Sequence, residues 1–502
     1  MAKQGFTPQE KNFPEWYQEV IAAADGMIYE APVRGCYTLG PLATELWFHR
    51  IVPVMDSWIK RLGVQNITLP LFIPNSYLES EKEHVEGFKP ECAVVTHAGG
   101  EKLAEPYVVR PTSETLFVDL FGKILHTYRD LPILFNQWCN ICRWEKRPRA
   151  FLRTAEFFWQ EGHTIHETWD EATGFAHRIL TDVYARFARE MLAIPVVTGE
   201  KPPSERFAGA EHTYSIEAMM SNGWALQAGT THVLSQRFFG DPANPAKCRV
   251  KFAGRDGTLQ VPFYTSWGVS TRMIGGIIMV HGDNQGIVLP PRIAPTQAAV
   301  LTLQADKNPA VMEAATEAAR RIAGVLEEPA RTGKFLRLSG ERRVLIDDRT
   351  ATLGEKHYYH EKQGTPIRIE IGPKDAEKKQ CVVVDRIAGR AGKEFVPFGG
   401  LKEHVAARLE KIHEGLYRRA LDRMKAKTRP VGSWGELAEG INGGFFCEGY
   451  IDTGTPEAED RLKRELKATL RVHPFDGEEP KPGVCLVTGK PVPKPVIIAR
   501  NY

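Results

Sequence analysis

Residues 136–166 constrain the fold of this chain more than any other stretch, because two strand-like runs there flank a loop rich in arginine. The second run places Phe157, Trp159, Glu161 and His163 at alternate positions, so a strand would turn these four side chains toward one face. Ionisable groups are rarely buried without partners. We therefore expect a β-hairpin whose second strand forms the floor of a polar site.

The loop and its borders concentrate positive charge. The cations within residues 143–153 are Arg143, Lys146, Arg147, Arg149 and Arg153. Arg143 and Glu145 are two positions apart, which predicts that they share one face of the first strand. Because Arg binds phosphate oxygens bidentately and keeps its charge, this density predicts a polyphosphate site. The alternative is a solvated hairpin with a structural Arg–Glu pair.

The hairpin resembles motif 2 of the class II aminoacyl-tRNA synthetases, and RWE, FLRTAEF and WQEGH are similar to the prolyl-tRNA synthetase family of archaeal/eukaryotic type. The resemblance implies an α+β fold, with an antiparallel-sheet catalytic domain of the class II kind. It also implies that Arg143 holds the α-phosphate of ATP and contacts proline, and that Phe157 stacks on adenine. Arg153 would meet the outer phosphates, and Glu145 would help to place the nucleotide and Mg²⁺.

Residues 110–114 (RPTSE) precede a helical pattern, and hydroxyls followed by a Glu are typical of a helix cap. The same residues resemble the T-x-E loop of the prolyl family, which contacts the amino acid. That resemblance places Thr112 and Glu114 at proline, together with Trp159, Glu161 and His163. The cap and the substrate contact both remain open from the sequence.

Two later segments complete the expected site. LQAGTTH resembles a family segment in which Gln227 and Thr230 lie by ATP and Mg²⁺ and His232 borders proline. Residues 266–280 contain one cation, Arg272, among small and apolar residues, and a buried unpaired Arg is costly. The segment resembles class II motif 3, which implies that Arg272 binds the γ-phosphate, and we expect Ser270 to border ATP. A buried Arg–carboxylate pair is the alternative.

The chain has 502 residues, too many for one hydrophobic core, so we expect a catalytic domain over 1–296 and two further domains. Beyond residue 297 strand-like and helical runs alternate, which predicts an α/β domain over 297–402 and a small α/β domain over 403–502. IRIEIGPKD resembles the anticodon-binding domain of this synthetase group. We expect four of its residues to read unstacked anticodon bases: Arg368, Glu370, Lys374 and Asp375. Ordinary exposed charges are the alternative.

A helix followed by a strand containing Pro70 resembles class II motif 1, which implies a homodimer. In the archaeal/eukaryotic prolyl type, four cysteines of the C-terminal domain often bind zinc. Only Cys447 and Cys485 match here. Two thiols do not complete a tetrahedral site, so we expect no structural zinc.

The composition excludes several classes. The sequence has no apolar run near 18 residues and no signal-peptide pattern, so we expect no membrane span and no secretion. Eight scattered cysteines fit a reducing compartment, which predicts a cytoplasmic location. A net charge of +3 restricts any nucleic-acid contact to local basic patches. Neither a dinucleotide-binding glycine motif nor a P-loop motif is present, so side chains must hold the phosphates.

The resemblance therefore implies ATP-dependent attachment of proline to tRNA(Pro) through prolyl-adenylate, with Arg143 and Arg272 as the principal catalytic cations. The implied partners are ATP with Mg²⁺, L-proline, tRNA(Pro) and a second copy of the chain. Two alternatives remain: a class II synthetase for another amino acid, and a non-catalytic synthetase-like RNA-binding protein. Motifs 2 and 3 are too close together for a large inserted editing domain, so we expect measurable activation of alanine or cysteine without hydrolysis of the mischarged product.

Overall fold

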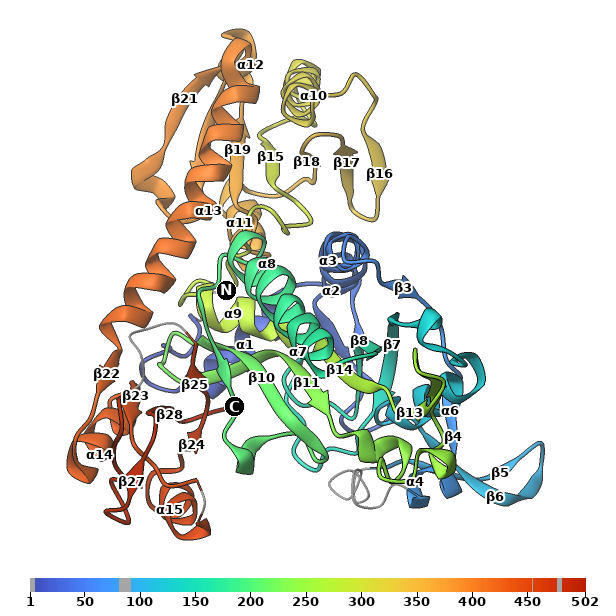
Figure 1. Ribbon diagram of the computed structural model, residues 1–502. Helices are drawn as coiled ribbons and strands as arrows, with labels where there is room; N and C mark the ends of the chain where they lie inside the picture. Colours follow the sequence, from blue (N-terminus) through green and yellow to red (C-terminus); the bar gives the residue numbers. More distant parts are fainter. Residues whose placement is uncertain (1–4, 81–91, 454, 476–480) are drawn as a thin grey trace.

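The expected hairpin lies inside an antiparallel sheet (Figure 1). The computed structural model describes residues 5–80, 92–453, 455–475 and 481–502. In spatial order the strands of this sheet are β25 (His473–Pro474), β9 (Val196–Glu200), β10 (Ala210–Met219), β11 (Ala225–Leu234), β14 (Phe263–Ser270), β8 (Glu156–His166), β7 (Ile133–Cys142) and β3 (Gln65–Asn66). The β3–β7 pair is parallel and the other neighbours are antiparallel.

Helices cover one face of this sheet and leave the other face to the polar residues. Helix α7 (Trp169–Arg178) contacts β8, β11 and β14, and α9 (Arg272–His281) contacts β11 and β14. Trp267 on β14 packs into this helix-covered core. It lies opposite Gly162 on β8, where an added Cβ would come within 2.0 Å of the Trp267 ring. Glycine at that position therefore allows the two strands and the helix layer to pack together.

The N-terminal part adds helices and short strands around the sheet. Its elements are α1 (Phe13–Ala23), β1 (Ile28–Glu30), β2 (Tyr37–Leu39), α2 (Pro41–Thr44), a π-helical turn (Glu45–Ile51) and α3 (Val52–Lys60). A separate three-stranded sheet follows, with β4 (Phe72–Pro74), α4 (Asn75–Ser80), β5 (Val94–Ala98), β6 (Glu101–Val109) and then α6 (Glu114–Ile124). Between β11 and β14 lie β12 (Phe252–Ala253) and β13 (Leu259–Gln260).

Two expectations about strand ends are wrong. Strand β7 ends at Cys142, so Arg143 and Glu145 lie in the loop, where Oε1 of Glu145 accepts from the N–H of Arg147 at 2.8 Å and closes a turn. The strand that we expected to contain Pro70 ends at Asn66. Beyond it, Nη1 of Arg110 donates to the carbonyl oxygens of Leu69 and Pro70 at 2.8 and 3.3 Å. Side chains thus replace a strand ladder in that segment.

The second sheet alternates with helices as expected. Its spatial order is β16 (Ala330–Thr332), β17 (Phe335–Ser339), β18 (Arg343–Asp347), β15 (Ala298–Thr302), β19 (Ile367–Ile371), β20 (Gln380–Asp385) and β21 (Glu394–Pro397). The helices are α10 (Pro309–Ala323), α11 (Leu353–Lys362) and α12 (Pro373–Glu377). Strand β15 is parallel to both of its neighbours, which is typical of an α/β layer.

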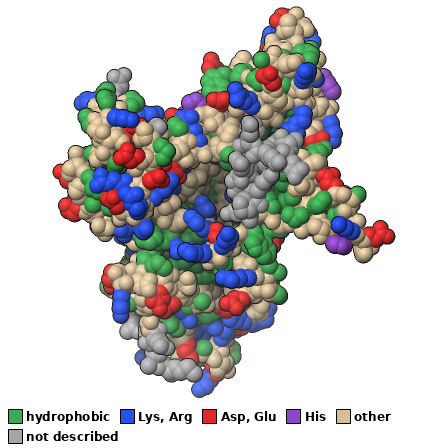
Figure 2. Space-filling model, turned by 90° about the horizontal axis from the view of Figure 1, so that it is seen from below, with side chains coloured by type: hydrophobic (Ala, Val, Ile, Leu, Met, Phe, Trp, Pro, Cys, Tyr) green, Lys and Arg blue, Asp and Glu red, His purple; other side chains and the backbone are tan. Residues whose placement is uncertain are grey.

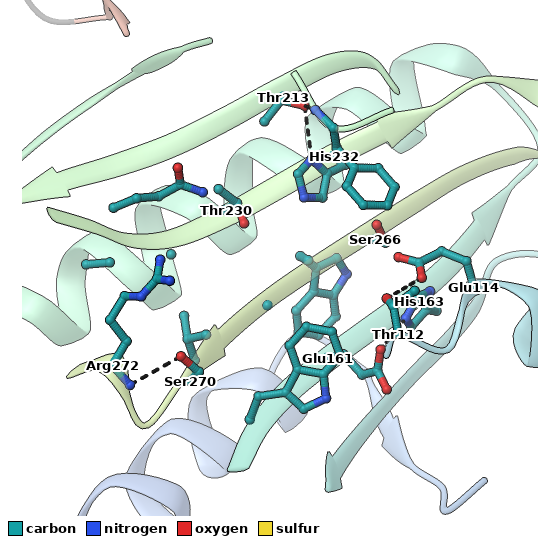
Figure 3. Close-up of a pocket in the computed structure, with 18 of the residues that line it drawn as sticks. Thr112, Glu114, Glu161, His163, Thr213, Thr230, His232, Ser266, Ser270 and Arg272 are labelled. Atoms are coloured by element: carbon teal, nitrogen blue, oxygen red, sulfur yellow. Dashed lines mark hydrogen bonds and ion pairs between the residues drawn. The ribbon is translucent and has the colours of Figure 1, made fainter. Parts of the chain in front are cut away.

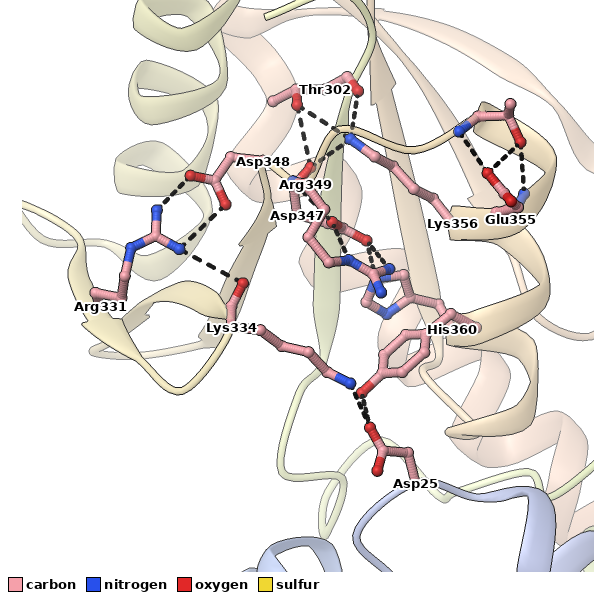
Figure 4. Close-up of polar contacts among 12 residues, drawn as sticks. Asp25, Thr302, Arg331, Lys334, Asp347, Asp348, Arg349, Glu355, Lys356 and His360 are labelled. Atoms are coloured by element: carbon pink, nitrogen blue, oxygen red, sulfur yellow. Dashed lines mark hydrogen bonds and ion pairs between the residues drawn. The ribbon is translucent and has the colours of Figure 1, made fainter. Parts of the chain in front are cut away.

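Ion pairs join this second sheet to the catalytic part. At the tip of the β16–β17 hairpin, Nζ of Lys334 lies 2.5 Å from Oδ2 of Asp25, which also accepts from the Tyr359 hydroxyl (Figure 4). The buried Arg386 makes two bonds to the carboxylate of Asp283, at 2.8 and 2.7 Å. Charged contacts therefore hold the two parts in one orientation.

The C-terminal part begins with the long helix α13 (Leu401–Ala426), whose first half packs in the core of the second sheet. A four-stranded sheet follows in the order β22 (Thr428–Pro430), β23 (Phe446–Gly449), β28 (Val496–Ala499) and β24 (Thr469–Leu470). Around it lie α14 (Trp434–Asn442), α15 (Pro456–Arg461), β26 (Gly483–Val484) and β27 (Pro491–Val492). Strand β25 leaves this part and joins the edge of the catalytic sheet at β9.

Candidate active site

A cavity of about 270 Å³ opens on the face of the catalytic sheet that the helices leave free. Figure 2 shows a hollow on this side of the molecule that is bordered by Lys and Arg side chains. The expected site residues that line the cavity are Thr112, Glu114, Arg143, Phe157, Trp159, Glu161, His163, Gln227, Thr230, His232, Ser270 and Arg272. The tertiary structure thus brings together residues from five separate segments of the chain.

The cavity has two ends of different chemistry (Figure 3). Arg272, Ser270 and Thr230 lie toward one end, whereas Thr112, Glu114, Glu161 and His163 gather at the other. Strand alternation explains the second group, because Glu161 and His163 are two residues apart on β8 and face the same side. The same alternation on β14 points Ser266 and Ser270 into the cavity, with Gly268 between them.

Arg143 and Arg272 supply the positive charge. Nε of Arg143 donates to the carbonyl oxygen of Pro111 at 3.0 Å, and its guanidinium lies 5.3 Å from the centre of the Trp159 ring. Within the described residues, the guanidinium of Arg272 bonds to the Leu152 carbonyl, at 3.2 and 3.1 Å, and to no carboxylate. The alternative of a buried Arg–carboxylate pair is therefore wrong.

Burial and the nearby positive charges of Arg153 and Arg143 lower the pKa of Arg272 to about 10. The guanidinium still carries its charge at pH 7. A group of like charges in a half-closed cavity is favourable only when an anion neutralises it. The arrangement is therefore suited to a polyphosphate at this end.

The acidic end is built around Glu161. Its Oε1 atom accepts from Oγ of Ser113 at 2.5 Å and from the Gln137 amide, and its Oε2 atom lies 3.2 Å from Nε2 of His163. Although burial alone would raise it, these hydrogen bonds lower the pKa of Glu161. The carboxylate is therefore ionised at neutral pH, which suits a ligand that carries a positive nitrogen.

The side chains of the loop before α6 bond to residues of the cavity and do not cap the helix. Ser113 occupies the N-cap position, but its hydroxyl donates to Glu161. The hydroxyl of Thr112 donates to Glu114, and both residues are buried. Of the two interpretations that the sequence left open, the hydrogen bonds favour a loop that lines the cavity.

His232 closes the cavity from β11. Its Nδ1 atom lies 3.0 Å from the Thr213 hydroxyl, and its ring lies 4.8 Å from the Phe207 ring. Burial, and next the neighbouring His163, lowers the pKa of His232 to about 3. The imidazole is therefore neutral at pH 7 and offers a hydrogen bond rather than a charge.

Two expected site residues lie outside the cavity lining: Glu145, in the loop turn, and the exposed Arg153. Conversely, Glu205, Arg206, Phe207, Thr213 and Ser266 line the cavity although sequence reasoning missed them. Glu205 ends a short 3₁₀ turn (Pro203–Glu205), and Arg206 and Phe207 follow it; such a turn has no periodic signal. The order of the strands could have identified Ser266 as a site residue, because it lies opposite both His163 and His232 in the sheet. Within the described residues its buried hydroxyl has no hydrogen-bond partner.

The expected base-reading residues are placed unequally. Arg368 and Glu370 are buried on one face of β19, where Arg368 pairs with Glu361 at 2.9 Å and Glu370 pairs with Lys393 at 2.9 Å. Lys374 is exposed on α12. The carboxylate of Asp375 accepts from the N–H of Gly372 at 3.1 Å. Of the four side chains, Lys374 is therefore the one that stands free in solvent.

The two C-terminal cysteines are buried apart from the cavity. Sγ of Cys485 accepts from the backbone N–H groups of Asp452, Val487 and Thr488, at 3.1 to 3.5 Å. Across the described ranges of the chain, no group of three or more His, Cys, Asp or Glu side chains is arranged to hold a metal ion. In those same ranges every helix is too short or too polar to cross a membrane.

An antiparallel sheet that carries arginines at one end of a cavity and buried carboxylates at the other defines the catalytic core of a class II aminoacyl-tRNA synthetase. Residues 96–281 match the family model of the tRNA synthetase class II core domain (G, H, P, S and T), and residues 297–408 match the anticodon binding domain. Residues 434–502 match the prolyl-tRNA synthetase C-terminal domain.

Full-length relatives agree with these models. The chain is 44% identical to the proline--tRNA ligase of Roseiflexus sp. (strain RS-1), with both chains covered completely. It is 43% identical to that of Salinibacter ruber over 99% of each chain, and 41% identical to that of Clostridium botulinum (strain Okra) over 99% of this chain and 98% of the relative. The chain therefore belongs to the proline--tRNA ligase family of class II synthetases.

Proposed function

We propose that this chain joins proline to tRNA(Pro) in two steps, first forming prolyl-adenylate from proline and ATP. The observation that carries the proposal is the two-ended cavity, in which Arg143 and Arg272 face the same space as Glu114, Glu161 and His163. Family membership supports the same activity. Cations at one end suit the triphosphate, and the ionised Glu161 at the other suits the secondary ammonium of proline.

In this proposal ATP lies over β8 and β14, with Phe157 on adenine and Arg143 on the α-phosphate. Arg272 and Arg153 take the outer phosphates, while Thr230 and Ser270 border the nucleotide. Mg²⁺ suits the amide oxygen of Gln227, since it prefers oxygen ligands and is usually held partly through substrate phosphates. When bound, the ion would neutralise phosphate charge. Glu145 remains a candidate ligand, although its carboxylate now closes a loop turn.

Proline would occupy the acidic end, against Trp159, Glu161 and His163. Glu114, held by the Thr112 hydroxyl, and the ionised Glu161 would face the ammonium, while the neutral His232 borders the ring. The unpartnered hydroxyl of Ser266 supports a polar ligand here. The proline carboxylate then attacks the α-phosphorus and pyrophosphate leaves. No side chain need form a covalent bond, because alignment and charge neutralisation lower the barrier.

The remaining proposals concern architecture. We propose domains over 1–296, 297–402 and 403–502, and three separate buried clusters support a division into three parts. Helix α13 is continuous across the second boundary, and its first half packs in the core of the second sheet. We propose the archaeal/eukaryotic architecture from the wording of the motifs alone, and the relatives named above come from bacteria. Eight free thiols support a cytoplasmic location.

We also propose a homodimer, a tRNA contact and a zinc-free C-terminal domain. Leu71, Phe72 and Tyr107 are 38%, 47% and 36% exposed around the three-stranded sheet, which supports a dimer contact there. The exposed Lys374 supports a contact with the anticodon, whereas Arg368, Glu370 and Asp375 would act through the ion pairs and the helix cap that they form. For the C-terminal domain, Cys447 and Cys485 are two thiols where a tetrahedral zinc site needs four ligands.

The experiment that tests the function is exchange of labelled pyrophosphate into ATP with each amino acid supplied singly. We expect proline to support the fastest exchange, followed by proline attachment to tRNA(Pro). Faster exchange with a different amino acid would show that this amino acid, and not proline, is the substrate. Absence of exchange with every amino acid would favour a non-catalytic protein.

A further inference from the structure

A buried cluster of three charges lies beside the catalytic cavity. The side chains of Lys201, Glu217 and Arg471 are 2%, 0% and 4% exposed. Nζ of Lys201 lies 3.0 Å from Oε1 of Glu217, and Arg471 donates to Oε2 from Nε at 3.1 Å and from Nη2 at 2.8 Å. Oγ of Ser215 adds a bond of 2.6 Å to Oε1. Both carboxylate oxygens are thus fully engaged.

Strand pairing places this carboxylate at the nucleotide end of the cavity. Glu217 on β10 lies opposite Gln227 on β11, and Ser215 lies opposite Thr230. Directly paired residues of an antiparallel sheet share a face, so Glu217 lies on the same face as these two cavity-lining residues. The mechanism proposed above assigns no role to Glu217.

Arg471 reaches the cluster from the C-terminal domain. It lies between β24 and β25, and β25 is the strand that joins the edge of the catalytic sheet at β9. The approach is close, because an added Cβ at Gly199 would lie 2.3 Å from the carbonyl oxygen of His473. A shared apolar cluster holds the contact: Met219, Ala225, Phe446, Val472, Ile497 and Ala499. The docking therefore delivers the guanidinium to a defined place.

The charges of the cluster do not balance. Two cations surround one carboxylate, which leaves one positive charge in excess in a buried setting. Burial lowers the pKa of Lys201, and Glu217 acts in the opposite direction. Although burial acts in the opposite direction, Arg471 and Lys201 lower the pKa of Glu217 to about 2, so the carboxylate is ionised at pH 7. Arg471 lowers and Glu217 raises the pKa of Arg272, so the cluster is close enough to act on that cavity residue.

We propose that Arg471 is a positioning residue for ATP, supplied by the C-terminal domain, which neutralises Glu217 and leaves a net positive charge behind Gln227 and Thr230. The proposal deepens the proposed function and rests on it for the identity of the nucleotide. If Arg471 positions ATP, the C-terminal domain takes part in adenylate formation and its role is more than structural. A purely structural role would instead make Arg471 matter only for docking.

The two roles are separated by charge. Arg471→Met leaves Lys201 and Glu217 as a neutral pair, and Lys201→Met leaves Arg471 and Glu217 as a neutral pair without altering the contact that Arg471 makes. Arg471→Lys keeps the charge with a different shape. Phe446→Leu is the matched control, because it weakens the shared apolar cluster without touching a charge. Each full-length variant is titrated with ATP by calorimetry and assayed for proline-dependent pyrophosphate exchange.

We expect Arg471→Met to weaken ATP binding about tenfold while the KM for proline stays within about twofold. Arg471→Lys should recover most of that affinity, and Lys201→Met should weaken ATP binding about as much as Arg471→Met. Phe446→Leu should lower the melting temperature and leave ATP affinity unchanged. An unchanged ATP affinity in Arg471→Met overturns the proposal. So does an unchanged ATP affinity in Lys201→Met, or an equal loss in Phe446→Leu.

Calorimetry also separates this inference from the proposed function. If the unmodified chain binds ATP but shows no proline-dependent exchange, the proposed function fails and the ATP titrations still decide the role of Arg471. If the unmodified chain does not bind ATP, both fail. Should Arg471→Met not fold, Lys201→Met and Arg471→Lys carry the test. An unchanged ATP affinity in Lys201→Met would contradict the proposal, and so would an ATP affinity in Arg471→Lys more than about tenfold below that of the unmodified chain.

Discussion

Nε2 of His163 lies 3.2 Å from Oε2 of Glu161, two residues earlier on the same strand, and both side chains are almost completely buried. Two further residues fix the position of the His163 ring. Its Nδ1 atom lies 2.7 Å from the Tyr264 hydroxyl, and the ring stacks on the Phe117 ring with their centres 4.0 Å apart. A carboxylate fixed in this way is preorganised for a cationic ligand and does not need to be desolvated when that ligand arrives.

Glu161→Gln removes this charge with little change in shape. We expect the KM for proline to rise about tenfold to a hundredfold, since a charged hydrogen bond contributes about 1.5–3 kcal/mol. The KM for ATP should stay within about twofold, because the proposed site of the triphosphate is at the other end of the cavity. Pyrophosphate exchange at varied proline and varied ATP measures both. Equal increases in the two constants would show that the cavity as a whole had been disturbed.

Arg143→Ala should lower the rate of pyrophosphate exchange about a thousandfold or more. The reason is that Arg143 is proposed to stabilise the negative charge that develops on the α-phosphate. The variant also loses the bond to the Pro111 carbonyl next to Thr112, so the KM for proline should rise as well. Circular dichroism and gel filtration should match the unmodified chain. The assignment would be rejected by exchange within about tenfold of normal.

Alanine should support measurable exchange. The segment between Glu161 and Arg272 builds strands β9, β10, β11 and β14 of the catalytic sheet itself, so its described residues form part of the core and not a separate inserted unit. Discrimination amounts to about 1–3 kcal/mol for each missing methylene, and alanine lacks two ring carbons of proline. We therefore expect a kcat/KM for alanine that is lower than that for proline by about thirtyfold to about 25,000-fold. Rapid hydrolysis of alanyl-tRNA(Pro) by the pure protein would contradict the absence of editing.

Arg386→Ala should separate the two steps of the reaction. This residue joins the second sheet to Asp283 of the catalytic part. We expect pyrophosphate exchange to stay near normal and kcat/KM for tRNA to fall at least about fivefold, because the anticodon-binding domain loses its fixed orientation. Arg331→Ala is the matched control, since Arg331 pairs with Asp348 within the same domain. An equal fall in kcat/KM for tRNA in the control would show that the effect does not depend on the contact between Arg386 and Asp283.

Stability should depend on pH through His281, which is fully buried and distant from the substrates in the proposed mechanism. Burial lowers the pKa of His281 to about 3, whereas in the unfolded chain it is about 6.5. Between these values the unfolded state binds more protons, so the free energy of unfolding falls as the pH is lowered through this window. From pH 6.5 to 5 the loss is about 2 kcal/mol for one such group.

His281→Gln retains a donor for the Leu192 carbonyl, to which the ring now bonds at 2.9 Å. This variant should lose about 2 kcal/mol less stability than the unmodified chain over the same pH range. Urea unfolding at pH 6.5 and pH 5 measures the difference. Identical pH dependence in the two proteins would show that His281 titrates normally in the folded state.

Much of the site was readable before the structure was known, for two different reasons. Alternation along 157–163 placed an aromatic pair and an acid–imidazole pair on one face, and the cavity lining confirms that arrangement. Motif wording led to Thr112, Gln227 and Arg272, which also line the cavity. The loop residues Glu145 and Arg153 were placed less well, because a turn closed by a side-chain hydrogen bond ends the strand period.

Phe207, Ser266 and Arg471 show what local patterns do not contain. Phe207 follows a 3₁₀ turn and reaches His232, and Ser266 becomes a site residue through the strands on either side of it. Arg368 and Glu370 looked like exposed charges that could read bases, yet their ion pairs bury them. Each of these outcomes depends on partners distant in the sequence.

The amino-acid sequence by itself determined the family, the order of the domains and the face on which each strand residue stands, because backbone periodicity and motif spacing are local. The tertiary structure alone decided which faces meet, how the carboxylates are held, and that an arginine from the last domain pairs with Glu217, opposite the cavity-lining Gln227 in the sheet. The physical reason is that strand register and domain docking are set by the burial of side chains hundreds of residues apart, and no local period records that burial.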